Sequence, residues 1–519
     1  MLSKNKIAIS VAVGILGVAG VMTSAQAVHV NPDGTGQVLL FPYYNARDGY
    51  VTNINIVNST DQTKAVKIRF REGKNSQDVL DFNIYMSPED VWTGSVQPGV
   101  GIDGKSKVAA ISTSDRSCTL PILVDCKVGE CVSKPQPFTG IGVAPDDTRE
   151  GYVEVIEMGV VTDKTVADGV LHTNGTPNNC KVLEAAWQYQ DKSPLGILDK
   201  NDVPVGIFAK GAGSADAEGI SAPTGGLFGS SAIINIGEGS AFAVDPIAID
   251  NYSTAPQHHR ADHTEQYLLP SLASGNVTTS SVMIHNAGGT QLVQTTWDTT
   301  AKDTCQDASG IPCGINPYPI AHVLLAPHLM NEYFLDPAFG YDGHTDWVVS
   351  FPMKKHGIHA GAQDITATFE NGIFDREEGR PAAVAGGDLD FGFSPPAGGG
   401  IDAVDQTSKL LREVNVLSFK STAQSEAALS RTVMSSLEAQ HISVGPFVYG
   451  WARLSFPGYD LSAGNPQGKG YGVTPANYTA GSNIYKGVPA VGAAFIEGNV
   501  SQNANARFGD ALPHKIQRD

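Results

Sequence analysis

Residues 66–71 read VKIRFR, and this hexapeptide decides the fold class. Apolar Val, Ile and Phe alternate with Lys and Arg, so the two kinds of side chain lie on opposite sides of an extended strand. A helix would instead need apolar residues three or four positions apart. The pattern therefore predicts a β-strand with one face in a hydrophobic core and a basic face in water.

The same alternation recurs along the chain, first at residues 80–86. Further strands are predicted at residues 37–43, 51–57, 152–161, 232–236, 282–285, 292–297, 347–351, 365–370, 414–419, 447–456 and 491–496. Helical spacing occurs only at residues 179–190 and around Leu429, Val433 and Leu437. Short strands with turn residues between them are typical of antiparallel sandwiches.

Composition favours the same architecture, because the chain has 57 Gly and 30 Pro but only 17% charged residues. We expect a mainly β protein of two antiparallel, immunoglobulin-like β-sandwich domains, with few short helices. The domains are predicted at residues 28–255 and 256–519, with the boundary in the polar stretch 251–263. The Gly-rich stretches 211–229 and 386–400 are expected to be long loops.

The first 27 residues have the three parts of a secretory signal peptide. Lys4 and Lys6 precede an uncharged apolar run at residues 7–22, and the small residues Ala25 and Ala27 frame a cleavage site. This run is shorter than the roughly 20 residues that a membrane-spanning helix needs. We expect cleavage after Ala27 and no transmembrane segment in the mature chain.

Six cysteines in an exported chain predict disulfides, because the compartments outside the cytoplasm are oxidising. The pairing is not determined by the sequence. Short spacing suggests Cys126 with Cys131 and Cys305 with Cys313, which leaves Cys118 for Cys180. A thiolate metal site is the alternative, and the absence of CxxC pairs argues against it.

Several strings resemble an uncharacterised family of secreted, surface-associated proteins of Gram-negative bacteria. The strings are VKIRFREGKNSQDVLDFNIYMSPEDVWTG (66–94), GQVLLFPYYN (36–45), EGYVEVIEMG (150–159), TDWVVSFPMK (345–354), EVNVLSF (413–419), GWARLSF (450–456) and VPAVGAAFIEG (488–498). The resemblance implies export and placement at the cell surface or outside the cell. It assigns no catalytic residue, cofactor or ligand to this chain.

No catalytic motif withstands a test of its context. Residues 99–104 match GxGxxG, but Pro98 precedes them and a strand-like stretch follows, so a turn is expected instead of a dinucleotide site. The motifs GxSxG and HExxH are absent. A Ser-His-Asp triad brought together by folding stays open. We expect that the protein is not an enzyme and needs no cofactor.

The strongest candidate metal site is the stretch HHRADHTE, in which His258, His259, Asp262, His263 and Glu265 combine imidazoles with carboxylates. Such ligands suit zinc or copper. A polar linker between domains explains the same residues.

Weaker candidates are the pair His356 and His359 and a carboxylate-rich loop containing Asp336, Asp342 and Asp346, which would suit calcium. A sugar-binding face is a further possibility, because aromatic residues recur on or near predicted strands. The candidate rings are Tyr43, Tyr44, Tyr50, Trp92, Trp297, Trp347 and Trp451. Alternation places most of these rings in the core.

The net charge of −18 argues against binding to nucleic acid, whose phosphates would be repelled. The sequence therefore favours a secreted or cell-surface, non-enzymatic protein with a structural or adhesive role. Its partners would be other cell-surface components or further copies of itself. The alternative is an extracytoplasmic protein that binds a metal ion (Zn, Cu or Ca) or a glycan.

Overall fold

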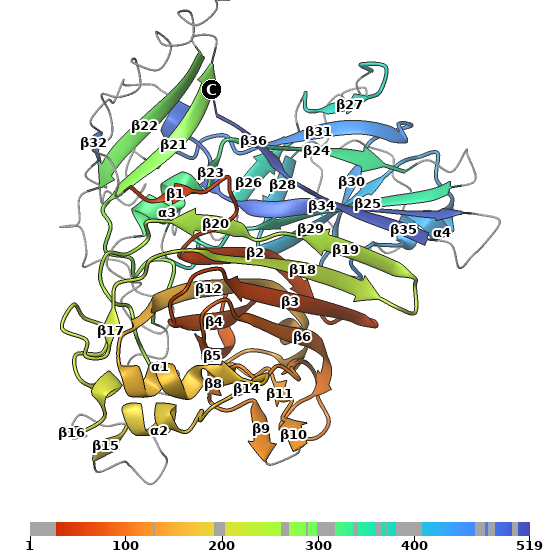
Figure 1. Cartoon of the computed structure of the whole chain (residues 1–519). Coiled ribbons are helices and arrows are strands. Elements are labelled where there is room, and N and C mark those ends of the chain that lie inside the picture. Colours follow the sequence, from red (N-terminus) through yellow and green to blue (C-terminus); the bar gives the residue numbers. More distant parts are fainter. Residues whose placement is uncertain are drawn as a thin grey trace, which may run out of the picture.

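A computed structural model gives the fold of most of the chain. It describes residues 27–127, 130–190, 203–260, 269–286, 289–297, 317–335, 341–356, 358, 365–369, 371–379, 407–461, 473–475, 483–500 and 507–518. The described part is mainly β, as predicted, and its strands form several antiparallel sheets (Figure 1). The one parallel pair among the described strands joins β29 (Val414–Lys420) to β30 (Gln440–Ser443).

Two large sheets are built from the first half of the chain. Sheet 1 contains, in spatial order, β1 (His29–Val30), β20 (Ile247–Asp250), β2 (Val38–Asn45), β12 (Glu150–Val161), β4 (Lys64–Glu72), β5 (Asp78–Met86) and β8 (Cys118–Leu120), with β17 (Ile220–Ser221) paired to β12. Sheet 2 contains β11 (Gln136–Pro137), β7 (Lys107–Ser112), β6 (Val91–Val100), β3 (Tyr50–Asn58), β18 (Leu227–Asn235) and β19 (Ser240–Val244).

Two more large sheets are built from the second half. Sheet 3 contains β30, β29, β25 (Tyr341–Ser350), β34 (Val491–Val500) and β35 (Arg507–Pro513). Sheet 4 contains β28 (Thr407–Leu410), β26 (Ile365–Thr368), β31 (Tyr449–Ser455), β24 (His328–Phe334) and β36 (Lys515–Gln517), with β27 (Ile373–Asp375) paired to β31.

The remaining elements are short. The small sheets are β9 (Val124–Lys127) with β10 (Glu130–Ser133), β13 (His172–Thr173) with β14 (Thr176–Pro177), β15 (Tyr189–Gln190) with β16 (Val203–Pro204), β23 (Leu325–Ala326) with β33 (Val488–Pro489), and β21 (Thr279–Asn286) with β22 (Gly289–Trp297) and β32 (Val473–Pro475). The described helices are α1 (Lys164–Val170), α2 (Val182–Ala186), α3 (Tyr318–Val323) and α4 (Glu426–Ser430), with 3₁₀ turns at Pro145–Arg149, Ile207–Ala209 and Asn483–Tyr485.

Each half of the chain contains two sheets that share one hydrophobic core. Phe70 of β4 and Val155 of β12 meet Ile54 of β3 and Trp92 of β6 between sheets 1 and 2. A second core lies between sheets 3 and 4, and its members include Trp347, Phe419, Leu329 and Leu454. Apolar residues at alternate strand positions build both cores, as the period-two patterns predict.

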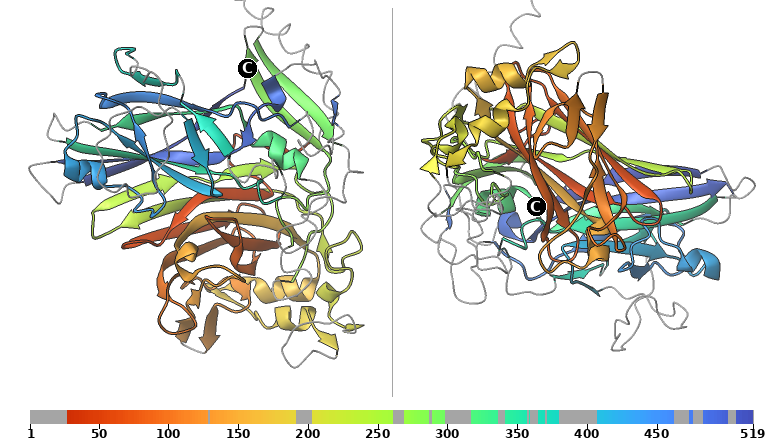
Figure 2. Two further views of the ribbon diagram at one scale, coloured as in Figure 1. Left: turned by 180° about the vertical axis from the view of Figure 1, so that it is seen from behind. Right: turned by 90° about the horizontal axis from the view of Figure 1, so that it is seen from below.

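A third core joins the two halves. It contains Val38 and Ile156 from sheet 1 and Val348, Val416 and Phe495 from sheet 3. Sheet 3 is therefore buried on both faces. The strands of sheets 3 and 4 stack on those of sheets 1 and 2 (Figure 1 and Figure 2, left). The predicted boundary between residues 255 and 256 falls between β20 and β21, and whether each half folds alone stays a prediction.

The expectation that the basic face of β4 lies in water is wrong. Lys67, Arg69 and Arg71 are fully buried. Each basic side chain of this face has a carboxylate partner on a neighbouring strand: Lys67 Nζ with Asp81 Oδ1 at 2.9 Å, Arg69 Nε with Asp78 Oδ2 at 2.7 Å and Arg71 Nε with Glu154 Oε1 at 3.0 Å. Lys64, at the start of β4 and on its other face, is paired as well, with Nζ 2.6 Å from Glu157 Oε1. Burial of these charges is tolerated because they are paired.

The polar stretch expected as an interdomain linker helps to cover this charged face. Asn83 Nδ2 donates to the carbonyl oxygen of His259 at 3.0 Å. Beyond the stretch, Pro270 also covers this face, because its carbonyl oxygen accepts from Arg69 Nη1 at 2.6 Å. His258 and His259 are buried as well. The described part of this stretch, residues 251–260, is therefore packed against the structure and is not an exposed linker.

Other local predictions have mixed outcomes. A helix is confirmed within residues 179–190, where α2 forms, although it is shorter than expected. The helix expected from Leu429 to Leu437 is wrong, because α4 ends at Ser430 and the following chain turns so that the Met434 N–H reaches Asp346 Oδ2 at 2.9 Å. The GxGxxG stretch comprises the last two residues of β6 and the turn that leads to β7, so the expected turn is confirmed. Of the two expected Gly-rich loops, residues 211–229 contain β17 and the start of β18, and residues 386–400 lie outside the described part.

Candidate functional site

Most of the aromatic residues considered for a sugar-binding face lie in the core. The buried ones are Tyr43, Tyr44, Tyr50, Trp92, Trp297 and Trp347. Trp451 differs, because 38% of its surface is exposed. In β31 the small or apolar residues Gly450, Ala452 and Leu454 point into the core between sheets 3 and 4, so Trp451 points outward.

The outer face of sheet 4 is ordered in rows by the register of its strands. Phe334 of β24 lies opposite Tyr449 of β31, and Glu332 lies opposite Trp451, which in turn faces Phe374 of β27. The next row contains Arg453, Met330 and Lys515, and the last contains Ser455, His328 and Gln517. Rows of one face are two residues apart, so the four rows span about 20 Å along the strands.

Four rings form the platform, a name used here for Phe334, Phe374, Tyr449 and Trp451. Phe374 stacks on Trp451 with ring centroids 4.4 Å apart and planes 13° apart. Phe334 meets Tyr449 edge to face at 5.8 Å. Tyr449 is 44% exposed, so the outermost rings of these pairs present apolar surface to solvent.

Exposed aromatic rings are scarce elsewhere on the described surface. Besides Trp451 and Tyr449, the exposed ones are Phe508 and Phe228. Phe508 of β35 lies 6.5 Å from the ring of Phe334, so it extends the platform towards sheet 3. Phe228 lies on β18 of sheet 2. Three of the four exposed rings of the described surface, those of Tyr449, Trp451 and Phe508, therefore gather at one place.

The core beneath the sheet holds the platform in position. The buried Tyr333 hydroxyl donates to the carbonyl oxygen of Phe374 at 2.9 Å, and burial raises the pKa of Tyr333, which keeps this donor protonated. Gly450 lets β27 approach, because a Cβ at this position would clash with the carbonyl oxygen of Phe374. Trp347 Nε1 donates to the carbonyl oxygen of Glu332 at 3.0 Å from the core side.

A pocket of about 190 Å³ lies at the other end of the same face. His328, Ser455, Tyr459, Lys486 and Gln517 contribute to its lining. Ser455 Oγ and His328 Nδ1 lie 2.8 Å apart. Hydroxyl, imidazole, amide and ammonium groups in one concave site provide both donors and acceptors for a polar ligand.

The predicted metal site is only partly described. His258 lies in the core, where its Nε2 is 3.0 Å from the Tyr85 hydroxyl and its ring packs 4.6 Å from those of Trp187 and Phe208. Burial lowers the pKa of His258 well below its usual value. The predicted ligands Asp262, His263 and Glu265 lie outside the described residues, and the described part holds no cluster of three possible ligands. Metal binding stays a prediction.

The structure also places some residues of the two weaker candidate ion sites. Asp342 and Asp346 lie within β25, so the expected calcium-binding loop is a strand at these positions. Asp346 is buried and accepts the Met434 N–H. His356 is buried, while His359 and Asp336 lie outside the described part of the chain.

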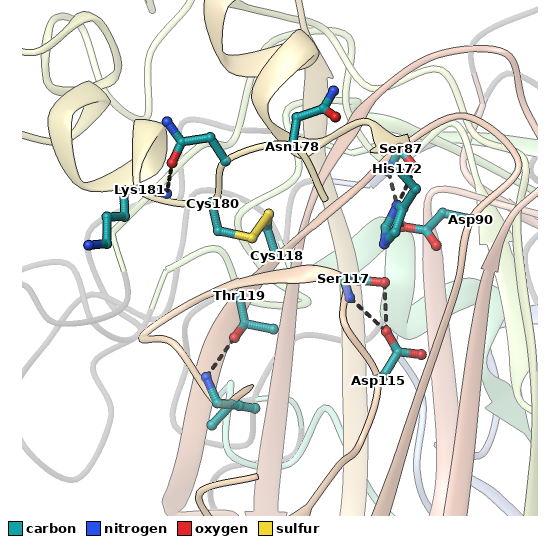
Figure 3. Close-up of a disulfide and its surroundings, with 12 residues drawn as sticks. Ser87, Asp90, Asp115, Ser117, Cys118, Thr119, His172, Asn178, Cys180 and Lys181 are labelled. Carbon is teal, nitrogen blue, oxygen red and sulfur yellow. Dashed lines mark hydrogen bonds and ion pairs between the residues drawn. A yellow bond between two sulfur atoms is a disulfide. The ribbon is translucent and has the colours of Figure 1, made fainter. Parts of the chain in front are cut away.

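One described cluster contains the residue types of a catalytic triad but not its geometry. Ser87 Oγ lies 3.1 Å from His172 Nδ1, and Asp90 Oδ2 lies 4.0 Å from the same nitrogen (Figure 3). A triad needs the serine and the carboxylate on different ring nitrogens. The cluster therefore lacks the proton relay of a serine hydrolase.

The disulfide between Cys118 and Cys180 is confirmed. It joins β8 to the segment just before α2, next to the Ser87 and His172 cluster (Figure 3). Cys126 and Cys131 are paired positions of the hairpin β9–β10, which agrees with a bridge between them without establishing one. Cys305 and Cys313 lie outside the described residues.

Sequence reasoning considered Trp451 but missed the surrounding residues. Tyr449, Trp451, Arg453 and Ser455 share one parity within a strand whose other positions are small or apolar. That parity was a usable signal for an outward aromatic face. The rows contributed by β27 and β36 come from strand pairing between distant segments, which the sequence alone does not reveal.

No helix in the described part of the chain is long and apolar enough to cross a membrane. Comparisons of the chain with protein-family models, with curated proteins and with solved structures found no match.

Proposed function

We propose that this chain is an exported, non-enzymatic protein of a Gram-negative cell surface that adheres to polysaccharide through the platform. The observation that carries the proposal is the gathering of exposed rings on the outer face of sheet 4. Aromatic rings bind the apolar CH faces of sugars, while polar groups beside them bind the hydroxyls. The platform and the neighbouring pocket supply both kinds of contact.

Export is supported by independent features. The N-terminal residues have the pattern of a cleavable signal peptide. The Cys118–Cys180 disulfide is of the kind that persists in oxidising compartments. The resemblance to secreted, surface-associated proteins favours the same placement.

The platform suits adhesion because it is shallow and extended. Four rows spanning about 20 Å offer contact to several units of a polymer, whereas the pocket accommodates one small group. Many weak contacts along a polymer add up through multivalency, so single-site affinity need not be high.

A binding assay with matched variants tests the proposal. The purified protein is titrated against neutral and acidic bacterial and plant polysaccharides by biolayer interferometry. Trp451→Ala removes the central ring and is expected to weaken binding about fivefold or more, because the lost stacking surface is worth about 1 kcal/mol or more. Trp451→Phe keeps a ring and should retain most of the affinity.

Phe228→Ala is the control, since Phe228 is also exposed (41%) but lies on sheet 2. Its affinity should equal that of the unmodified protein. Equal loss in Phe228→Ala and Trp451→Ala, or no binding to any polysaccharide, contradicts the proposal. New reducing ends in the polysaccharide would contradict its non-enzymatic part.

A further inference from the structure

The row next to the platform is basic. Arg453 of β31 and Lys515 of β36 both pair with Met330 of β24, so they flank it on the outer face of sheet 4. Lys486 lines the pocket at the following row. Three cations therefore lie within one end of a face whose other end is aromatic, on a chain with a net charge of −18.

These cations differ from the basic residues of sheet 1. There, Lys64 and Arg71 each have a carboxylate within 3.0 Å. No described carboxylate lies within ion-pair distance of Arg453, Lys515 or Lys486. Their charge is therefore not neutralised by described residues of the fold, and it is available to an external anion.

The surrounding carboxylates limit where an anion can lie. Glu332 is exposed and sits one row towards the aromatic end, beside Trp451. Asp460 forms an isolated β-bridge with Lys486 at the rim of the pocket. The row of Arg453 and Lys515 lies between these two carboxylates and is the row of the face that carries two cations.

We infer that the polysaccharide is acidic, and that its carboxylate groups lie over Arg453 and Lys515 while a neighbouring sugar ring stacks on Trp451. The inference rests on the proposed function and adds the chemical class of its ligand. A guanidinium presents paired donors that match a planar carboxylate, and adjacent rows are about 7 Å apart, which places the ring and the charge within one or two sugar units.

The side chain of Arg453 is partly buried at this row of sheet 4. Its Nε is buried without a hydrogen-bond partner among the described groups, so the base of the guanidinium is desolvated without a compensating hydrogen bond. Lys515 is exposed at the edge strand β36. An anion that contacts the guanidinium would offset the desolvation of this group.

A matched pair of polymers tests the inference without changing the protein. Polygalacturonate carries one carboxylate on each sugar, and its fully methyl-esterified form carries none. The protein is expected to bind the acidic polymer at least tenfold more tightly, and added NaCl should reduce that preference because salt screens exposed charges. Equal affinity for both polymers overturns the inference but leaves the proposed function standing.

Single substitutions test which cations bind the carboxylates of the polymer. Lys515→Gln and Arg453→Gln should each lower affinity for polygalacturonate severalfold and leave affinity for the esterified polymer unchanged. Lys107→Gln, an exposed cation on β7 of sheet 2, is the matched control and should change neither. Lys515 lies on the surface, so its variant is informative even if Arg453→Gln fails to fold. Binding to neither polymer and to no other polysaccharide counts against the proposed function itself.

Discussion

Gly450 is the residue on which the platform depends most. Any side chain at this position meets the carbonyl oxygen of Phe374, and Phe374 is the ring that stacks on Trp451. We predict that Gly450→Ala displaces β27 and weakens polysaccharide binding about as much as Trp451→Ala does, although every aromatic ring is retained. Binding assays on the two variants check this. Gly450→Ala with full affinity would show that Phe374 does not hold the platform in place.

Glu413 links protonation to the contact between the two halves of the chain. It precedes β29, its N–H donates to the carbonyl oxygen of Lys74 at 3.2 Å, and its side chain is buried. Burial raises its pKa from 4.5 to about 7, against the opposing effect of Lys354 and Lys355, while Glu72 adds to the rise. A raised carboxyl pKa stabilises the folded state fully below pH 4.5, and this contribution is lost as the pH rises through 7.

Glu413→Gln cannot ionise, so it should remove this dependence. Relative to the unmodified protein, we expect the variant to gain roughly 1–3 kcal/mol in free energy of unfolding between pH 5 and pH 8. Lys355, whose pKa is lowered to about 7, is present in both proteins, so the contribution that it loses as the pH falls from 10.5 to 7 enters both measurements. Urea unfolding at both pH values measures the difference. A constant difference between the two proteins would contradict the assignment.

At the scale of elements, the paired charges between β4 and its neighbours make sheet 1 sensitive to single changes. Lys64 and Glu157 are both fully buried, and Glu157 also accepts the N–H groups of Thr224 and Gly225. Lys64→Met leaves a buried carboxylate without its cation and should cost about 3–5 kcal/mol. The double variant Lys64→Met with Glu157→Gln should cost less than the sum of the two single changes, as urea unfolding would measure. Strict additivity would show that the pair is not coupled.

Strand positions followed from the sequence because alternation is local. Residues 66–71, 152–161 and 414–419 all form strands close to the predicted bounds. The burial of the basic side chains of β4 could not be predicted from the sequence, because it depends on which segment covers sheet 1. The carboxylates of β5 and β12 lie opposite the cations of β4 only once register is known. Similarly, parity placed Trp451 outside, but its neighbours Phe374 and Lys515 come from strands that pair at long range.

At the scale of the whole molecule, the stacking of two pairs of sheets decides which surface is free. Sheet 3 is buried between sheet 4 and sheet 1, so most aromatic residues of the second half lie inside. Among the described residues, no further sheet lies over the outer face of sheet 4 (Figure 1). A binding role for the outer face of sheet 4 therefore depends on the packing of all four sheets, because the core under sheet 4 holds the rings of the platform in position.

Tryptophan fluorescence tests the binding face most directly, because the chain has five tryptophans and four of them, Trp92, Trp187, Trp297 and Trp347, are buried. Acrylamide should quench mainly Trp451 in the free protein. Saturating polygalacturonate is predicted to remove this accessible fraction, since a sugar ring would cover the indole. Quenching that stays the same at every polygalacturonate concentration would contradict binding of this acidic polysaccharide at the platform.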